Sequence, residues 1–165
     1  MDRLELKTKL LEKFQKDLKY HLSLYKKEMD AQQEEANYHK GAMESRYDTF
    51  KEEAQMLKDA YQKQYNEINQ NLLELGNFIY NWKNNPKKDK VVKIGSLLKV
   101  YNENDDIEEW FFIFQNQLSY VKYDIDGELI QIVNPTAPLP KLMLRKEEGD
   151  EIEFNNNFYE ILEIV

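Results

Sequence analysis

The feature that most constrains this chain is a run from residue 2 to about residue 82 that contains no proline and only two glycines, Gly41 and Gly76. Leu, Glu, Lys and Gln dominate the run, and all four are good helix formers. Apolar residues recur at heptad spacing, first as Leu4, Leu11, Leu18 and Tyr25 and later as Tyr61, Ile68, Leu75 and Trp82. This spacing predicts two long helices that bury their apolar stripes against each other.

The apolar repeat lapses between about Asp30 and Thr49, which predicts that the chain turns back there. Gly41 lies beside the midpoint of the run, and a glycine readily adopts the positive φ that a tight connection needs. We therefore expect an antiparallel coiled-coil hairpin over residues 1–82, with an acidic tip near residues 38–50. Because heptad stripes by themselves indicate only a coiled coil, the residues at the tip must decide the function.

The chain changes character after Trp82. Residues 83–90, KNNPKKDK, contain Pro86 and a cluster of lysines, and they predict a short basic linker. Residues 91–165 contain β-branched and aromatic runs separated by turn signals such as NENDD, DG and NNN. These runs predict five or six strands in one small antiparallel domain, with a short helix or turn at PLPKLML.

Charge and composition exclude several classes of protein. The net charge is −8; residues 1–90 carry 17 basic and 16 acidic side chains, whereas residues 91–165 carry 6 and 15. Direct DNA binding is not expected, because phosphate contacts need clustered Lys and Arg. The chain has no cysteine, and it lacks both a signal-peptide core and the roughly 20 apolar residues of a membrane span. We expect a cytoplasmic protein without disulfides or thiolate metal sites.

An autonomous enzyme is not expected either. The sequence contains no glycine-rich phosphate loop, no nucleophile elbow and no H-E-x-x-H zinc motif. Its two histidines, His21 and His39, have no second histidine or cysteine at ligand spacing.

The expected tip carries six carboxylates, which belong to Glu34, Glu35, Glu44, Asp48, Glu52 and Glu53. Glu44 and Asp48 are four residues apart, so a helix presents both on one face. One interpretation is that these acids stabilise the start of the second helix through its dipole. The other is that they complete a Mg²⁺ site inside a partner, because Mg²⁺ keeps several waters and takes further ligands elsewhere.

The C-terminal half carries a family resemblance. The stretch from Val133 to Val165 resembles the C-terminal domain of bacterial Gre transcript cleavage factors, and Val91 to Asn102 resembles the opening strand of that domain. The matching residues are Val133, Pro138, Leu139, Leu142, Leu144, Lys146, Gly149, Asp150 and Ile152. A helical hairpin followed by an FKBP-like β domain is also the Gre order, so the resemblance implies an α+β fold of that kind.

The resemblance implies a function as well. Gre factors insert their coiled coil into the secondary channel of RNA polymerase, where acidic tip residues help to hold the second catalytic Mg²⁺ and the polymerase cleaves its own backtracked RNA. By this resemblance Glu44 and Asp48 assist the Mg²⁺ of the polymerase. The protein would be a monomer without its own cofactor or nuclease activity, and the docking residues would be Pro138, Leu139, Lys146, Gly149 and Asp150.

The tip departs from the family motif G-D-L-x-E-N. Helices of near-equal length result when this motif is placed on residues 44–49, which puts Asp48 at the Glu position and Ser45 at the Asp position. One family acid is therefore missing, although Glu44 stands next to it. Three alternatives stay open: a channel-binding regulator without cleavage, a coiled-coil adaptor for another protein, and a prolyl isomerase, which only the fold would suggest.

Overall fold

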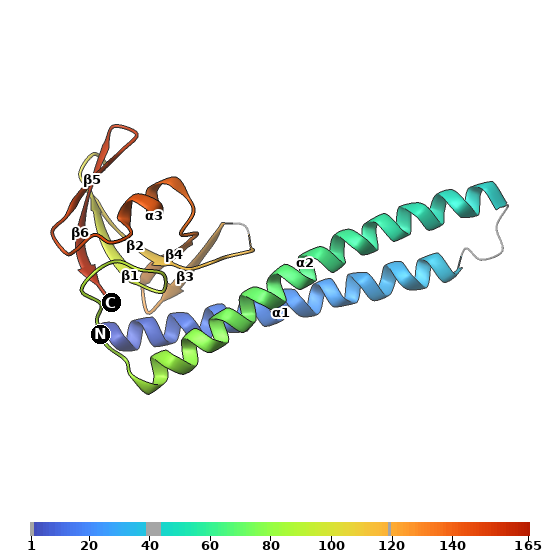
Figure 1. Cartoon of the computed structure of the whole chain (residues 1–165), viewed down its shortest axis with the longest axis horizontal. Coiled ribbons are helices and arrows are strands. Elements are labelled where there is room, and N and C mark those ends of the chain that lie inside the picture. Colours follow the sequence, from blue (N-terminus) through green and yellow to red (C-terminus); the bar gives the residue numbers. More distant parts are fainter. Residues whose placement is uncertain (1, 39–43, 119) are drawn as a thin grey trace. The chain divides into compact units, whose positions relative to one another are not determined.

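The computed structural model describes residues 2–38, 44–118 and 120–165, and the side chains of these residues except 38 and 44–47. Two long helices come first, α1 over Arg3–Tyr38 and α2 over Glu44–Asn84 (Figure 1). Their lengths of 36 and 41 residues confirm the expected pair of near-equal helices. Gly41, the residue expected at the turn, lies outside the described residues. None of the described helices is long and apolar enough to cross a membrane.

The chain forms two compact units, one made of Met1–Phe14 with Leu75–Val165 and the other of Gln15–Glu74. In the second unit α1 and α2 run antiparallel. The rings of Tyr25 and Tyr61 lie 6.2 Å apart between centroids, and Lys58 donates a hydrogen bond to the side-chain oxygen of Gln33 at 2.6 Å. Contacts between residues early in one helix and late in the other are those of an antiparallel hairpin.

The first unit contains a six-stranded sheet in the order β3-β4-β2-β1-β6-β5. A short helix, α3, precedes β5, so the expected strands and the expected short helix are confirmed. The bounds are β1 Leu97–Asn102, β2 Ile107–Ile113, β3 Val121–Ile125, β4 Glu128–Val133, α3 Pro138–Met143, β5 Glu151–Phe154 and β6 Asn157–Ile164.

The sheet is mixed, whereas the sequence pattern predicts an antiparallel domain. Strands β2 and β4 pair in parallel, with Trp110 opposite Ile130 and Ile113 opposite Val133. The reason is that β3 pairs antiparallel with β4 on the outer side of the sheet, so β4 lies between β2 and β3. After β2 the chain therefore skips the position beside β2, forms β3 at the edge of the sheet, and returns as β4 to fill the skipped position.

The second half of β2, from Trp110 to Ile113, is buried on both faces, as expected for a strand covered on both sides. On one face the rings of Phe112 and Phe114 pack against the ring of Phe78 from α2, with ring centroids 6.3 and 5.6 Å apart. The ring centroid of Phe14 from α1 lies 6.3 Å from that of Phe114. The other face contributes to a second apolar cluster made of Val92, Leu98, Val100, Phe111, Ile113, Met143, Ile152, Tyr159, Ile161 and Ile164. The aromatic run of β2 is thus divided between two cores.

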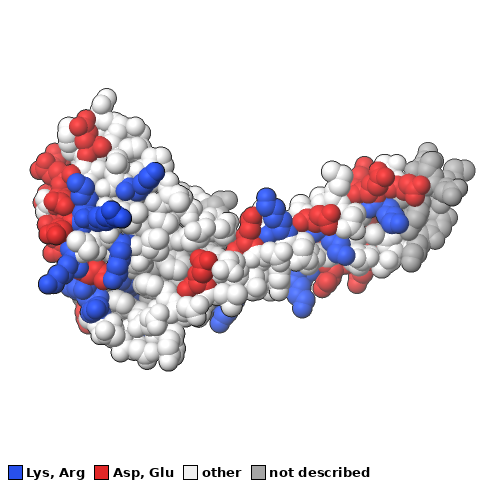
Figure 2. All heavy atoms as spheres, viewed as in Figure 1, with Lys and Arg blue, Asp and Glu red and all other residues white. Residues whose placement is uncertain are grey.

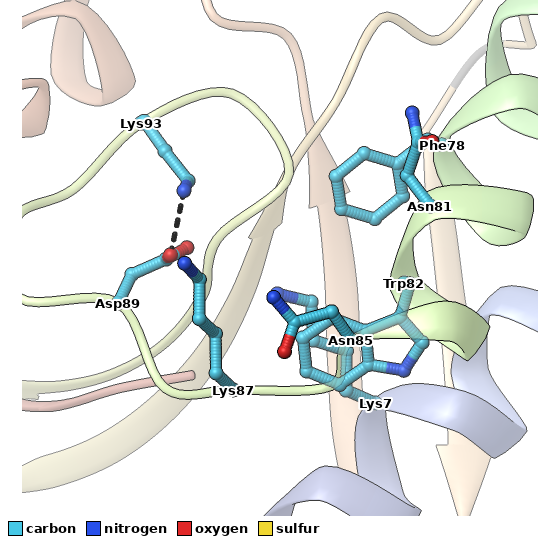
Figure 3. Close-up of a pocket in the computed structure, with 8 residues that line it drawn as sticks. All are labelled: Lys7, Phe78, Asn81, Trp82, Asn85, Lys87, Asp89 and Lys93. Atoms are coloured by element: carbon cyan, nitrogen blue, oxygen red, sulfur yellow. Dashed lines mark ion pairs between the residues drawn. The ribbon is translucent and has the colours of Figure 1, made fainter.

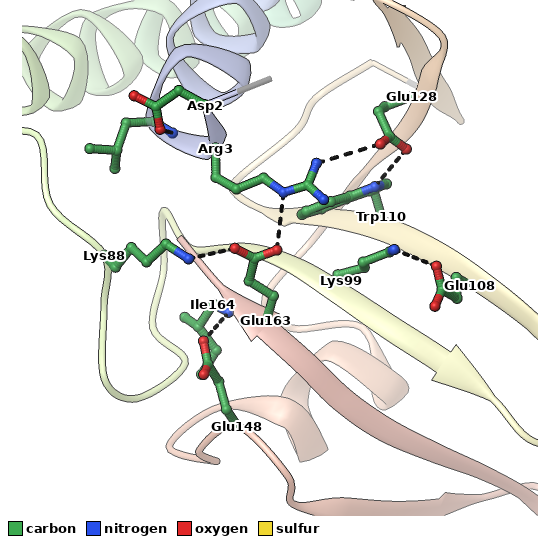
Figure 4. A network of polar contacts seen from close by, with 11 residues as sticks. Asp2, Arg3, Lys88, Lys99, Glu108, Trp110, Glu128, Glu148, Glu163 and Ile164 are labelled. Carbon is green, nitrogen blue, oxygen red and sulfur yellow. Dashed lines mark hydrogen bonds and ion pairs between the residues drawn. The ribbon is translucent and has the colours of Figure 1, made fainter.

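Polar contacts join the start of α1 to the sheet (Figure 4). The guanidinium of Arg3 donates to Glu163 of β6 at 3.1 Å and lies 4.9 Å from the ring centre of Trp110. Lys88 pairs with the same carboxylate, and the indole N–H of Trp110 donates to Glu128 at 2.9 Å. These contacts link the N-terminal helix, the linker and three strands of one unit.

Candidate functional site

The acidic end of the hairpin begins at the first residue of α2. Glu44 is that residue, and Asp48 follows one helical turn later with an exposed side chain. The side chain of Glu44 lies outside the described residues, as does that of Ser45. Because residues four apart lie on the same face of a helix, the backbone places Glu44 and Asp48 on one side of α2.

Four further acids of the expected tip lie within the described helices. Glu34 and Glu35 belong to the last turns of α1, Glu52 and Glu53 belong to α2, and all four are exposed. Figure 2 shows acidic side chains on the surface of the unit formed by Gln15–Glu74. Over the described part of the chain, no three His, Cys, Asp or Glu side chains come together as a metal site. Carboxylate oxygens suit Mg²⁺, and these four acids are exposed to solvent.

The five residues expected to dock on a partner lie in the segment from α3 to the start of β5. Pro138 occupies the first turn of α3, where its fixed φ suits a helix start, and Leu139 packs against the second apolar cluster. Gly149 has φ +86° and donates its N–H to the backbone oxygen of Ile161 at 2.7 Å. Asp150 accepts the backbone N–H of Glu147 at 2.8 Å through its carboxylate. Gly149 and Asp150 therefore shape the turn into β5.

Lys146 differs from its neighbours in the motif. Its backbone oxygen accepts the N–H of Val92 at 2.8 Å, which fixes the main chain beside the linker. Its half-buried side chain makes no ion pair with the described residues. Among the motif residues, Lys146 is thus the one whose charge has no opposite charge paired with it in the described part of the chain.

Pro138 and Leu139 line an open groove of about 390 Å³ between α3 and the sheet. Phe111, Val133 and Phe154 supply apolar walls, and Gln131 and Asn134 supply amides. The sequence pattern did not reveal this set, because Phe111 and Phe154 belong to strands far apart in the sequence. The alternation of the aromatic run at residues 110–114 was the available signal, and it assigned those rings to a core without showing the groove.

A second hollow in the same unit contains a residue that the sequence pattern did not single out. Lys7 of α1 is buried and lines a cavity of about 230 Å³ with residues from the end of α2 and the linker (Figure 3). Burial lowers the pKa of Lys7 to about 7, and Asp89 opposes this shift while Lys93 adds to it. Lys7 is a charged residue, so the apolar periodicity did not mark it.

No protein-family model matches the chain, and no curated protein matches it. Solved structures do match. The chain is similar to Gre-type transcription elongation factors. The GreA factor homolog 1 (Gfh1) of Thermus thermophilus is 10% identical, covers 92% of this chain and 94% of its own, and gives a TM-score of 0.34.

Two further Gre-type structures match at comparable levels. The Gfh1 of Thermus aquaticus is 9% identical over 90% of this chain and 92% of its own, with a TM-score of 0.35. A GreA/GreB elongation factor from Nitrosomonas europaea is 18% identical over 55% of this chain and 90% of its own, also with a TM-score of 0.35. At these values we infer the function from the motif and the hairpin of this chain itself.

Proposed function

We propose that this protein is a transcription elongation factor that inserts its helical hairpin into the secondary channel of RNA polymerase and promotes Mg²⁺-dependent cleavage of backtracked RNA. The observation that carries the proposal is the position of Glu44 and Asp48 in the first turns of α2, at the far end of two helices of 36 and 41 residues. A helix of this length rises about 54 Å or more. It can carry a carboxylate pair deep into a partner.

The chemistry required of these residues is limited. The polymerase supplies the catalytic groups and most ligands of the metal, and the two carboxylates add negative oxygen ligands for a second Mg²⁺. In two-metal phosphoryl chemistry one ion activates the attacking water and the other stabilises the leaving oxygen. The proposed factor therefore has no nuclease activity and no cofactor of its own, and it acts in the cytoplasm together with the polymerase.

The β domain supports the same proposal through its resemblance to the Gre motif. Pro138 and Leu139 border an open groove, and Lys146 has a charge that no described carboxylate neutralises. We assign docking on the polymerase to this segment. Gly149 and Asp150 contribute by holding the turn that presents it.

A second candidate function is a regulator that occupies the channel without promoting cleavage. Ser45 favours it, because Ser45 stands where the Gre tip motif has an acid. A hydroxyl is a weaker Mg²⁺ ligand than a carboxylate, so the loss of one acid weakens recruitment of the second ion.

The experiment uses a stalled, backtracked elongation complex with 3′-end-labelled RNA and Mg²⁺. Wild type is expected to release short 3′ fragments, and the Glu44→Ala, Asp48→Ala double variant is expected to release none. The matched control is Glu52→Ala, Glu53→Ala, which removes two exposed acids from the same helix and should retain cleavage. Ser45→Asp should increase the cleavage rate.

The other outcomes distinguish the alternatives. Intact RNA in a complex that still retains the protein would favour the channel-binding regulator, and a gain of cleavage in Ser45→Asp would then identify the missing acid as the cause. Failure of the wild-type protein to bind polymerase would favour a coiled-coil adaptor for another protein.

A further inference from the structure

Basic side chains gather where the linker meets the segment that follows α3. The N–H of Val92 donates to the backbone oxygen of Lys146 at 2.8 Å, and the N–H of Arg145 donates to the backbone oxygen of Val92 at 2.8 Å. A bridge between Val91 and Glu147 continues this pairing. The fold therefore places two basic segments, which are far apart in the sequence, side by side on one surface.

This surface, here named the linker patch, is formed by Lys87, Lys90, Lys93, Arg145 and Lys146. Four of these side chains are exposed and that of Lys146 is half-buried. Figure 2 shows Lys and Arg side chains gathered on one side of this unit. Of the five, Lys93 alone makes an ion pair with a residue that the structure describes, and its partner is Asp89. Lys88 is left out of the patch because it pairs with Glu163.

The linker patch differs in charge from the rest of the β domain. Residues 91–165 carry 6 basic and 15 acidic side chains, whereas the segments 87–93 and 145–147 together carry six basic and two acidic ones. The two acids are Asp89 and Glu147, and Asp89 is engaged by Lys93 at 2.7 Å. Because charges are screened beyond about 10 Å at 0.1 M salt, a ligand on the patch interacts chiefly with this local excess of positive charge.

The composition of the patch favours a phosphate ligand over a protein surface. Protein–protein interfaces are depleted in lysine, and their centres are rich in aromatic side chains. The two segments contain no aromatic residue, and the exposed apolar side chains beside the lysines are Val91 and Ile94. Lys and Arg groups without carboxylate partners bind phosphates well, because each contact releases a counterion from the nucleic acid. Without aromatic rings the patch offers nothing on which bases can stack.

We propose that the linker patch binds the phosphate backbone of a double-stranded nucleic acid without recognising its base sequence. A duplex carries one negative charge per about 1.7 Å of its axis, so it presents phosphates to the patch more densely than a single strand does. The proposal departs from the expectation of no direct DNA binding that the sequence pattern supports. In the sequence Lys93 and Arg145 are separated by residues 94–144, and only the fold joins them.

The proposal is independent of the action on polymerase. All five residues of the patch belong to one compact unit, whereas the acids of the hairpin tip belong to the other. Lys146 also lies in the segment to which docking on polymerase is assigned, so the test leaves Lys146 unchanged. Binding is measured on the free protein, and its failure would leave the proposed function standing.

The test titrates the full-length protein into a fluorescein-labelled duplex of about 20 base pairs and follows the fluorescence anisotropy at several NaCl concentrations. We expect saturable binding with a Kd of about 100 μM or tighter at low salt, as in other non-specific complexes. The logarithm of the binding constant should fall with the logarithm of the salt concentration with a slope of about −3 to −4, because each phosphate contact contributes about −0.9. Two duplexes of unrelated sequence should bind within about threefold of each other.

The patch variant combines Lys87→Gln, Lys90→Gln and Arg145→Gln. These side chains are exposed, so the variant should fold, which its thermal unfolding checks. It should bind the duplex about tenfold more weakly or worse, and its salt slope should be shallower by about 2 to 3.

The matched control combines Lys16→Gln, Lys19→Gln and Lys26→Gln. It removes three exposed positive charges from α1 and so has the same net charge as the patch variant. Its affinity for the duplex should stay within about twofold of wild type.

A labelled poly-glutamate peptide with as many charges as the duplex distinguishes a nucleic acid from an acidic protein. Its charges are spaced by up to about 3.3–3.6 Å along the chain, about half as densely as in the duplex, so it should bind at least about tenfold more weakly. The proposal is overturned if the duplex does not bind saturably, or if the control variant loses as much affinity as the patch variant. It is also overturned if poly-glutamate binds as tightly as the duplex, which would assign the patch to an acidic protein.

Discussion

Arg3 Nε donates a hydrogen bond to Glu163 Oε2 at 3.1 Å, which joins the first turn of α1 to the last strand. The same guanidinium lies over the ring of Trp110 at 4.9 Å, and both partners of the pair are partly buried. Planar stacking and directed N–H groups distinguish arginine from lysine at such a position. The contact therefore depends on the guanidinium as well as on its charge.

Arg3→Lys should lower the free energy of unfolding by about 1 kcal/mol, and Arg3→Ala by about 2 kcal/mol, because the first loses the stacking and the second also loses the ion pair. Urea denaturation followed by tryptophan fluorescence measures both changes. Equal values for the two variants would contradict a specific role of the guanidinium plane.

Gly95 is the second position where a small change should have a large effect. Its φ is +92°, and a Cβ atom there would lie 2.2 Å from Cε2 of Phe78. Gly127 has φ +88°, but a Cβ atom at that position would meet nothing within 4 Å. Gly127→Ala should thus cost about 1 kcal/mol from backbone strain alone, and Gly95→Ala about 2 to 4 kcal/mol because overpacking is added. Thermal unfolding of the pair isolates the steric part, and similar values would refute it.

The lowered pKa of Lys7 predicts that the stability of the protein depends on pH. Its pKa is about 7 in the folded protein and 10.5 in the unfolded reference, so between these values the unfolded state binds more protons. The free energy of unfolding therefore rises with pH from 7 towards 10.5, by up to about 1.4 kcal/mol per pH unit, and this gain is absent below pH 7. The difference in the free energy of unfolding between wild type and Lys7→Met, measured from pH 7 to 10, isolates this contribution. A constant difference across the range would contradict the lowered pKa.

In the segment from α3 to the start of β5, Asp150 is expected to stabilise the turn, whereas Lys146 is expected to contact the polymerase. Asp150→Ala removes the acceptor of the Glu147 N–H and should cost about 1 kcal/mol of stability. Lys146→Gln should leave stability within about 0.5 kcal/mol and weaken binding to polymerase. Paired denaturation and binding measurements on both variants check this. A stability loss in Lys146→Gln equal to that of Asp150→Ala would remove the assigned docking role.

Much of the helical hairpin could be predicted from the sequence, because its burial repeats along one helix face. Leu11, Leu18, Leu75 and Trp82 of the predicted stripes are buried. Leu6 and Leu10 are buried as well, although they lie outside the stripe. Their part of α1 also packs on the sheet, where Phe14 meets Phe114 and Lys13 donates to the backbone oxygen of Asp124. A heptad pattern predicts that a helix packs against one other helix, and it does not show that the same helix also packs against a sheet.

The sheet was predictable strand by strand but not in its order. Runs such as EEWFFIF and ELIQIV have strand composition, whereas the parallel pairing of β2 with β4 depends on a crossing that no local signal encodes. The candidate site shows the same division. The acids of α2 are visible in the sequence by their spacing. The cavity of Lys7 instead combines the start of α1 with residues that begin at Phe78, far along the chain. Only the tertiary structure brings these together.

Insertion of the hairpin into the polymerase channel is tested by locating the end of the hairpin inside the complex. The chain has no cysteine, so Asp48→Cys provides a single attachment point for an iron chelate that generates hydroxyl radicals, and Lys16→Cys provides a control on α1. If the hairpin enters the channel, the chelate at position 48 cleaves the polymerase next to its catalytic Mg²⁺, while the chelate at position 16 does not. Retention of the labelled protein on polymerase without cleavage near the catalytic Mg²⁺ would contradict insertion of the hairpin into the channel.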